Sequence, residues 1–440
     1  MIIDINRYND AVEQMEVLGE VGKVIQVTGF LIKAIVPGVR VGSLCEIQSG
    51  PQNHFMAEVV GFDGQTALLM PLEALKPIGH GSRVVLKKAQ SLVNVGEALL
   101  GRVIDGLGRP LDGLGEIETS AALPLYADTQ NPLERQPIRE PMSLGVRAID
   151  AMLTVGKGQR VGIMAGSGVG KSVLMGMMAR ASSSDVNVIA LVGERGREVK
   201  EFIEDVLGEE GMKRSIVIVA TSDQSPLVRM RAAFVATTIA EYFCRQNNDV
   251  LMMMDSVTRF AMAQREIGLS IGEPPATKGY TPSVFGLLPK LLERAGNFEG
   301  NGSITGLYTV LVEGDDMDDP IGDAVRSIVD GHIVLSRKLT HKGHFPAIDV
   351  MQSTSRVMPN IVSREHRDWA MSVRQIMAQY SDAEDLINIG AYKQGSNPKI
   401  DQAIHYIDPI IDFLRQDMTE NSDWPATVKK MQGVFGGGEA

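Results

Sequence analysis

A lysine and a serine follow a glycine-rich turn in the stretch MAGSGVGKSVLMG, residues 164–176. The apolar run Arg160–Met164 before the turn predicts a strand, and the residues from Lys171 onward predict a helix. In this context backbone N–H groups and the helix N-terminus can surround phosphate oxygens, because glycine lets the ligand come close. We therefore predict a phosphate-binding loop in which Lys171 reaches the β- and γ-phosphates and the Ser172 hydroxyl binds Mg²⁺. The residues predicted to form this site are Gly166, Ser167, Gly168, Val169, Gly170, Lys171, Ser172 and Val173.

One position departs from the usual pattern of such a loop. Counting back from Gly170, Ala165 stands where the first glycine is usual. An ordinary glycine-rich turn is the alternative interpretation. The succession of strand, loop, GKS and helix argues for phosphate binding instead.

Two acidic residues follow apolar segments downstream. Asp255 ends the run DVLMMMDS, and Glu194 follows NVIALVG, 23 residues after Lys171 (194 − 171). An aspartate at the carboxyl end of a parallel strand next to the loop is placed to organise Mg²⁺. A carboxylate on the neighbouring strand could orient or deprotonate water. Without the loop, Asp255 would be interpreted as a strand end and Glu194 as part of a solvated charge cluster.

The elements that must position these residues fall into three domains and a short leading segment. Short β-branched runs between glycine and polar turns in residues 17–88 predict a small β-barrel or sandwich. In residues 89–362 a turn-rich connection precedes strand-like runs that alternate with helical stretches, which predicts a parallel sheet covered by helices. Residues 363–440 are charged and helical in pattern and end in a flexible tail. Residues 1–16 form the leading segment.

Composition narrows the class of protein. No apolar run reaches the roughly 18 residues of a membrane helix, and the start of the chain lacks the pattern of a secretory signal. We therefore expect a cytoplasmic protein. Cys45 and Cys244 stand far apart without a metal-binding or redox spacing, which predicts two free thiols. The net charge of −11 argues against a broadly basic surface for nucleic acid.

Several long motifs carry a resemblance to one family. In chain order they are GSGVGKS, VGERGREVKEFIE, DSVTRFAMAQREI, GEPPATKGYTPSVFGLLPKLLERAG, YTVLVEGDDMDDPI, DGHIVLSRKL and HFPAIDVMQSTSRVMP. They resemble the ATPases of flagellar and virulence type III protein export, which are similar to the catalytic subunit of rotary ATP synthases. The resemblance covers about Gly19 to Met418 and implies a RecA-like P-loop core, hydrolysis of ATP, and Mg²⁺ as cofactor. Ala165 is usual in the export branch.

The resemblance also implies roles for single residues. Glu194 matches the carboxylate that polarises the attacking water, and Asp255 matches the acid that holds Mg²⁺ largely through water. Arg195 matches a residue close to the γ-phosphate, and Phe345 matches the aromatic side chain that stacks on adenine. Arg356 matches the arginine finger that reaches into the site of a neighbouring subunit. Taken alone, Phe345 would be interpreted as a core aromatic and Arg356 as a surface arginine.

Partners are implied in the same way. Because one chain carries every catalytic group, a homohexamer could work without a second kind of subunit. The leading segment has Ile5, Tyr8, Val12 and Met15 at helical spacing, and such a helix needs a partner surface. In flagellar export ATPases this end is similar to the segment bound by a stator-like regulator; packing on the chain's own barrel is the alternative. The other implied partners are a central-stalk-like coiled-coil protein, the export gate and chaperone–substrate complexes, at the periphery of the inner membrane.

The implied function is that of an ATP-hydrolysing motor of flagellar type III export, which couples hydrolysis to chaperone release and substrate delivery. The phrase LINIGAYKQGSNPKID looks like the flagellar branch. A virulence type III secretion ATPase is the alternative, because the two branches share every catalytic motif.

Three further alternatives remain. A rotary ATP synthase catalytic subunit fits less well, since GERGRE replaces a threonine-containing version and a DELSEED-like acidic lever is absent. An RNA-translocating hexamer would need aromatics among basic residues in the barrel, whereas residues 17–88 hold only Phe30, Phe55 and Phe62. A scaffold that binds ATP without turnover would not need Glu194.

Overall fold

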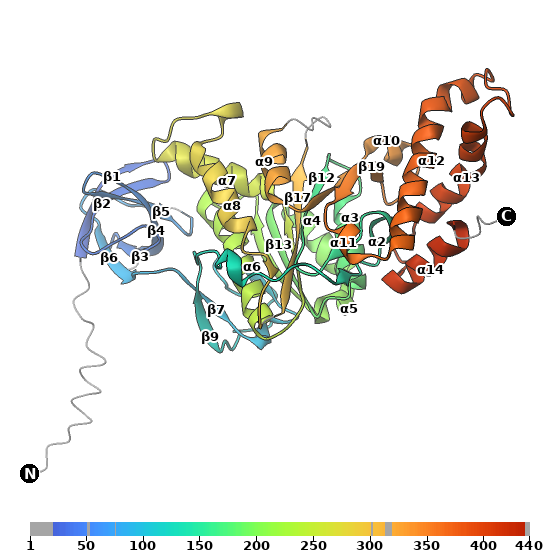
Figure 1. The fold of residues 1–440 in the computed structure, drawn as a ribbon. Coiled ribbons are helices and arrows are strands. Elements are labelled where there is room, and N and C mark those ends of the chain that lie inside the picture. Colours follow the sequence, from blue (N-terminus) through green and yellow to red (C-terminus); the bar gives the residue numbers. More distant parts are fainter. Residues whose placement is uncertain (1–20, 51–52, 75, 301, 313–318, 436–440) are drawn as a thin grey trace, which may run out of the picture.

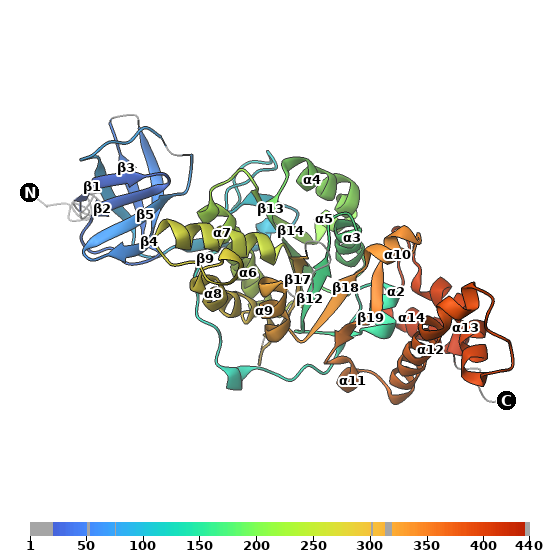
Figure 2. The same cartoon turned by 90° about the horizontal axis from the view of Figure 1, so that it is seen from above.

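The structure is a computed structural model that describes residues 21–50, 53–74, 76–300, 302–312 and 319–435 (Figure 1). The predicted partner-binding segment 1–16 lies outside these residues. A β-barrel, an α/β body and a helical region follow one another, with the barrel and the helical region at opposite ends (Figure 2). Within the described part of the chain, no helix is long and apolar enough to cross a membrane.

Six strands close the barrel, in the order β1-β2-β5-β4-β3-β6. Alternate residues of each strand face inward, and Val24, Ile32, Ile47 and Leu69 are fully buried inside it. The β-barrel prediction is therefore confirmed. The strands are β1 Val21–Thr28, β2 Leu31–Ile35, β3 Leu44–Gln48, β4 His54–Asp63, β5 Thr66–Pro71 and β6 Arg83–Lys88.

A nine-stranded sheet forms the centre of the α/β body, in the order β19-β18-β12-β17-β15-β13-β14-β8, with β16 paired to β17. The strands run parallel except β19 and β16, so the predicted parallel sheet carries two antiparallel additions. The turn-rich segment predicted as a connection supplies the edge strand β8. The bounds are β8 Val103–Asp105, β12 Arg160–Ala165, β13 Val186–Glu194, β14 Ser215–Thr221, β15 Val250–Asp255, β16 Gly296–Asn297, β17 Ser303–Leu311, β18 Gly331–Leu335 and β19 Ile348–Ser355.

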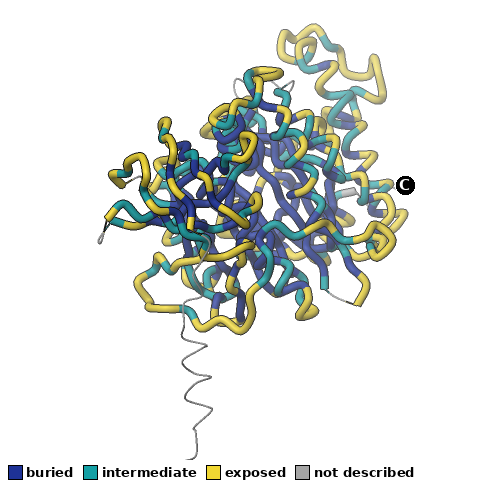
Figure 3. Tube along the Cα trace, turned by 90° about the vertical axis from the view of Figure 1, so that its left-hand side faces the viewer, coloured by how far each residue is buried: buried dark blue, intermediate teal, exposed yellow. Residues whose placement is uncertain are grey.

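Helices cover both faces of this sheet. In β13, Val188 and Ala190 join the core beneath α6 and α7, while Ile189 and Leu191 join the core that contains α3. Because successive residues face opposite sides, a sheet buried on both faces needs nearly continuous apolar strands, and Figure 3 shows the centre of the molecule as buried. The helical elements are α3 Lys171–Ala181, α4 Gly196–Glu201, η3 Phe202–Leu207, α5 Gly208–Lys213, α6 Pro226–Arg245, α7 Val257–Ser270, η4 Thr277–Gly279, α8 Pro282–Leu292, α9 Pro320–Ile328 and α10 Arg337–His341.

The C-terminal helices pack against the same body. Val373, Ala403 and Phe413 belong to the core cluster that includes the α3 face of the sheet. Arg147 is buried between the two parts and donates to the carbonyl of Phe413 at 3.0 Å. The C-terminal helices are α12 Arg364–Asn388, α13 Pro398–Leu414 and α14 Trp424–Phe435, and two short helices that precede them in the chain are α2 Arg147–Met152 and α11 Met358–Ile361. The remaining elements are β7 Leu92–Val95, η1 Glu97–Leu99, β9 Ala121–Pro124, η2 Pro132–Glu134, β10 Pro141–Met142 and β11 Val155–Gly156.

Candidate active site

The predicted phosphate-binding loop joins the end of β12 to the start of α3. Gly170 stands immediately before α3 with φ 88°, a left-handed conformation that favours glycine. The first N–H groups of a helix have no partner within the helix. They therefore face the loop together with the positive end of the helix dipole, an arrangement that attracts anions.

The structure brings Lys171, Glu194 and Asp255 together at the carboxyl edge of the sheet. The Lys171 ammonium hydrogen-bonds to Oδ1 of Asp255, and its Nζ lies 3.7 Å from Oε1 of Glu194. Thr309 donates to the same Asp255 oxygen at 2.7 Å. Asp255 is buried, so these two donors stabilise a carboxylate that has lost most of its water.

The strands that carry these two acids pair with each other, but neither of them pairs with β12. β17 lies between β12 and β15, and β15 lies between β17 and β13. The loop carries Lys171 away from the end of β12, and the carboxyl ends of all four strands share one edge. The intervening strand β17 supplies Thr309, which no sequence motif indicated.

Burial shapes the chemistry of Glu194. Loss of water around the carboxylate raises the pKa of Glu194 to about 7, with the nearby charge of Asp255 adding to the effect and Lys171 opposing it. A carboxyl group with a pKa near neutrality is suited to accept a proton from water or to orient it. The position of Glu194 is thus compatible with the role that its sequence context suggests.

A cavity of about 670 Å³ opens above the loop. Glu194 and Arg195 line it, together with two basic residues that the sequence analysis did not assign, Arg259 and Arg337. A Cβ on Gly193 would lie 2.9 Å from Cβ of Arg259, so the glycine allows Arg259 to pack closely against β13. The buried Nε of Arg259 has no hydrogen-bond partner in the part of the chain that the structure describes. The cavity is therefore suited to a polyanion.

Arg195 lines this cavity from its rim. Its side chain is 79% exposed and lies 3.5 Å from the carboxylate of Glu198. Arg259 could have been found from the sequence, because it stands four residues after Asp255 in the motif DSVTRF. Arg337 lies in SRKL, which the family motifs contain, but no pattern there points to an anion.

A second cavity of about 350 Å³ adjoins the first, and Gly170 and Val173 line both. Its walls are mostly apolar, and Phe345, a residue that is 48% exposed, is one of those that line it. Gln416 and Met418, which follow α13, complete it. No local sequence signal indicated these two residues, because the fold brings them to the cavity from the C-terminal region. A flat apolar group here and a polyanion in the first cavity would together match a nucleoside triphosphate.

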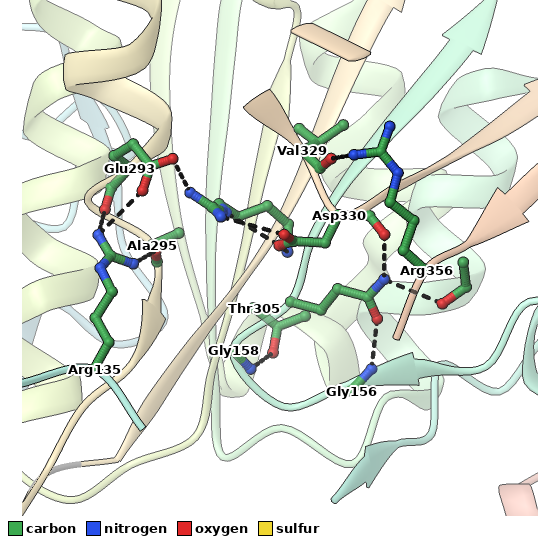
Figure 4. A network of polar contacts seen from close by, with 12 residues as sticks. Arg135, Gly156, Gly158, Glu293, Ala295, Thr305, Val329, Asp330 and Arg356 are labelled. Carbon is green, nitrogen blue, oxygen red and sulfur yellow. Dashed lines mark hydrogen bonds and ion pairs between the residues drawn. The ribbon is translucent and has the colours of Figure 1, made fainter. Parts of the chain in front are cut away.

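Arg356 lies at the opposite edge of the sheet. Its backbone N–H donates to the carbonyl of Asp330 at 3.0 Å. Its guanidinium donates to the carbonyl of Val329 at 3.4 Å (Figure 4). The backbone N–H of Asp330 in turn donates to the carbonyl of Arg160, the first residue of β12. The loop begins after Ala165, five residues beyond Arg160. At about 3.3 Å per residue, it therefore lies about 16 Å further along the strand. Arg356 is therefore not part of the cavity formed by its own chain.

Fold and site together define the class. A strand–loop–helix phosphate site with paired acids, in a sheet covered on both faces and preceded by a six-stranded barrel, belongs to the P-loop ATPases of the rotary ATP synthase type. Residues 145–355 match the family model of the nucleotide-binding domain of the ATP synthase alpha/beta family. Residues 362–433 match the C-terminal domain of the type III secretion ATPase EscN.

Proteins that are similar over nearly the whole chain identify the family within this class. The chain is 52% identical to the flagellum-specific ATP synthase of Bacillus subtilis, with 98% of each chain covered. It is 49% identical to the type 3 secretion system ATPase of Xanthomonas euvesicatoria, covering 94% of this chain and 93% of the relative. The solved structure of the assembled ATPase EscN in complex with its central stalk EscO, from enteropathogenic E. coli, superposes with a TM-score of 0.87 at 46% identity, covering 94% of this chain and 100% of that one. This chain belongs to the family of flagellum-specific ATP synthases and type III secretion ATPases, and it is an ATPase.

Proposed function

We propose that this chain is the ATP-hydrolysing motor of a flagellar type III export apparatus and works as a homohexamer. It couples hydrolysis to the release of chaperones and the delivery of export substrates. The observation that carries the assembly is the separation of Arg356 from the phosphate loop of its own chain. We call the edge of the sheet that carries Arg356 the arginine edge, and the edge that carries the phosphate loop the nucleotide edge. A head-to-tail ring brings the arginine edge of one subunit to the nucleotide edge of the next.

Within each site, the loop residues from Gly166 to Val173 hold the phosphates through backbone N–H groups, and Lys171 leaves Asp255 for the β- and γ-phosphates. Glu194 orients the attacking water and accepts its proton. Phe345 stacks on adenine in the apolar cavity. Arg195 approaches the γ-phosphate from the rim.

The donor set fits Mg²⁺. Within the described residues, no group of three or more His, Cys, Asp or Glu side chains is placed to hold a metal ion by itself. Mg²⁺ is typically bound by one or two protein groups together with substrate phosphates and water. Ser172 and Asp255 would hold it here, and when bound it neutralises charge on the transferring phosphoryl group.

The other partners are proposed from the family. The relative EscN has been solved in complex with its central stalk EscO, and we propose a central-stalk-like coiled-coil protein as the partner of this ring. Residues 1–16 bind a stator-like regulator. The export gate and chaperone–substrate complexes meet the ring at the periphery of the inner membrane, on the cytoplasmic side, and no nucleic acid is involved. The chain divides functionally into 1–16, 17–88, 89–362 and 363–440.

A gene replacement in the source cells tests this function. We expect Glu194→Gln to abolish export of flagellar hook and filament proteins. Glu201→Gln is the matched control, since Glu201 is exposed on α4 and pairs with Arg197 outside the cavity. It should leave export normal. Normal filaments in Glu194→Gln cells that no longer secrete other proteins would point instead to virulence secretion, which the Xanthomonas relative at similar identity keeps as the second candidate.

A further inference from the structure

One fully buried amide near the start of β12 has no place in the mechanism above. Gln159 is completely shielded from solvent. Its Oε1 accepts a hydrogen bond from the N–H of Gly156 at 2.8 Å. Its Nε2 donates to the carbonyl of Asp330 at 3.3 Å and to the hydroxyl of Ser355 at 3.1 Å, in the network drawn in Figure 4.

Both acceptors of Gln159 flank Arg356. Ser355 precedes it in the chain, and the carbonyl of Asp330 also accepts the backbone N–H of Arg356 at 3.0 Å. Ser355 is held further by donating to the carbonyl of Thr154 at 2.9 Å. A single amide group therefore connects the two points that fix the backbone at Arg356.

The Asp330 side of this arrangement is itself fixed. The backbone N–H and Nε of Arg160 each donate to Oδ2 of Asp330 at 3.1 Å, and Arg160 also forms an ion pair with Glu293. By contrast, the Arg356 side chain is exposed, and its guanidinium donates a hydrogen bond of 3.4 Å to the backbone carbonyl of Val329. The backbone of Arg356 is held in place, and its side chain is left able to extend.

We propose that Gln159 is a positioning residue for Arg356 and so sets the turnover of the neighbouring subunit's site rather than of its own. The proposal rests on the proposed role of Arg356 as an arginine finger. Displacing a catalytic group by about 1 Å can lower a rate by roughly 10²-fold. Supporting hydrogen bonds from buried side chains provide the accuracy that such a group needs.

The first test compares two variants of the same turn in purified rings. Gln159→Met keeps the length of the side chain and removes its hydrogen bonds, and we expect kcat to fall about 10- to 100-fold. We expect KM to change by less than about twofold. Thr305→Val is the control, because it removes the 2.9 Å hydrogen bond from Gly158 on the other side of this turn without touching Arg356. Equal losses in both variants, or a loss confined to KM, would overturn the proposal.

The second test asks in which subunit the effect appears. Gln159→Met chains are mixed with Glu194→Gln chains, whose own sites are inactive but whose Arg356 is intact. If sites act independently, about one quarter of the interfaces in a random equal mixture then combine an intact site with an intact finger, and activity should return to that level. No return above the two parent variants would show that Gln159 acts within its own subunit.

A reference mixture separates this inference from the function on which it rests. Arg356→Ala chains mixed with Glu194→Gln chains should also regain activity. If that mixture regains none, the finger assignment itself fails; if only the Gln159 mixture fails, the positioning role alone is wrong. Should Gln159→Met not fold, Ser355→Ala removes one of its two contacts beside Arg356, and the same recovery is expected.

Discussion

The catalytic charges at the two edges of the central sheet differ in their exposure to water. At the carboxyl edge, Lys171, Glu194 and Asp255 lie together, largely shielded from water and paired with one another. At the amino edge, Arg356 has a fixed backbone but an exposed guanidinium. A charge that stays within its own chain can be buried if it is paired, because an unpaired buried charge is very costly. A charge intended for another chain must remain solvated until that chain arrives.

This difference explains why one chain holds two halves of two different sites. At the nucleotide edge, Lys171, Glu194 and Asp255 already lie together in the single chain. At the arginine edge, Arg356 has no nucleotide site within reach until a neighbouring subunit supplies one. Changes at the nucleotide edge should therefore affect a subunit's own site, and changes at the arginine edge should affect its neighbour. The following predictions test this distinction.

The largest effect is expected at the arginine edge. Arg356→Ala should lower kcat of the ring by about 10³- to 10⁵-fold, the typical range for the loss of an arginine finger. ATP binding to the isolated chain should stay unchanged, because Arg356 does not reach its own cavity. Steady-state hydrolysis and equilibrium binding of a fluorescent nucleotide measure the two quantities. Arg364→Ala, at an exposed arginine of α12, is the control; impaired binding by the isolated Arg356→Ala chain would contradict the separation of the edges.

Next comes the carboxylate at the nucleotide edge. Glu194→Gln should lower kcat by roughly 10²- to 10⁴-fold, since an amide cannot accept the proton of the attacking water. ATP binding should persist, because the loop and Lys171 remain. Hydrolysis measured alongside thermal unfolding checks this, with Glu201→Gln as the matched variant on the adjacent helix. Wild-type turnover in Glu194→Gln rings would remove Glu194 from the mechanism.

A smaller effect is expected in the apolar cavity. Loss of a stacking aromatic costs about 1–3 kcal/mol per base, so Phe345→Ala should weaken ATP binding by roughly 5- to 150-fold and leave kcat nearly intact. Binding of inorganic triphosphate, which has no base, should not change. Phe30→Ala, at an exposed aromatic of the barrel, is the control. Equal weakening of ATP and triphosphate binding would show that Phe345 supports the loop rather than the base.

The smallest effect concerns pH. Because Glu194 must be ionised to act and its pKa is raised to about 7, kcat/KM should fall as the pH drops through about 7. The charge of Glu198 contributes to this raised pKa. Glu198→Gln should therefore move the midpoint to lower pH, by less than about one unit. A profile recorded from pH 5.5 to 9, with Glu201→Gln as control, measures the shift, and a midpoint near the ordinary glutamate value in the unchanged protein would contradict it.

Local sequence patterns predicted much of the fold, and they predicted the phosphate loop of the site but not every residue that lines it. The barrel strands, the alternation of strands and helices, and the strand–loop–helix at Lys171 are written in short stretches whose periodicity and glycines have direct physical meaning. Thr309 was missed because the sequence does not show that β17 separates β12 from β15. Gln416 and Met418 were missed because they come from the far end of the chain.

By itself the sequence determined which residues can do chemistry: a phosphate loop ending at Lys171, carboxylates at Glu194 and Asp255, and a family whose motifs run through Arg356. Only the tertiary structure decided where each of them acts. Parallel strands place every carboxyl end at one edge, which gathers Lys171, Glu194 and Asp255. The antiparallel return of β19 carries Arg356 to the other edge, which the length of β12, about 16 Å along the strand, separates from the loop of its own chain. Strand direction is set by long-range pairing, which no local stretch of sequence contains.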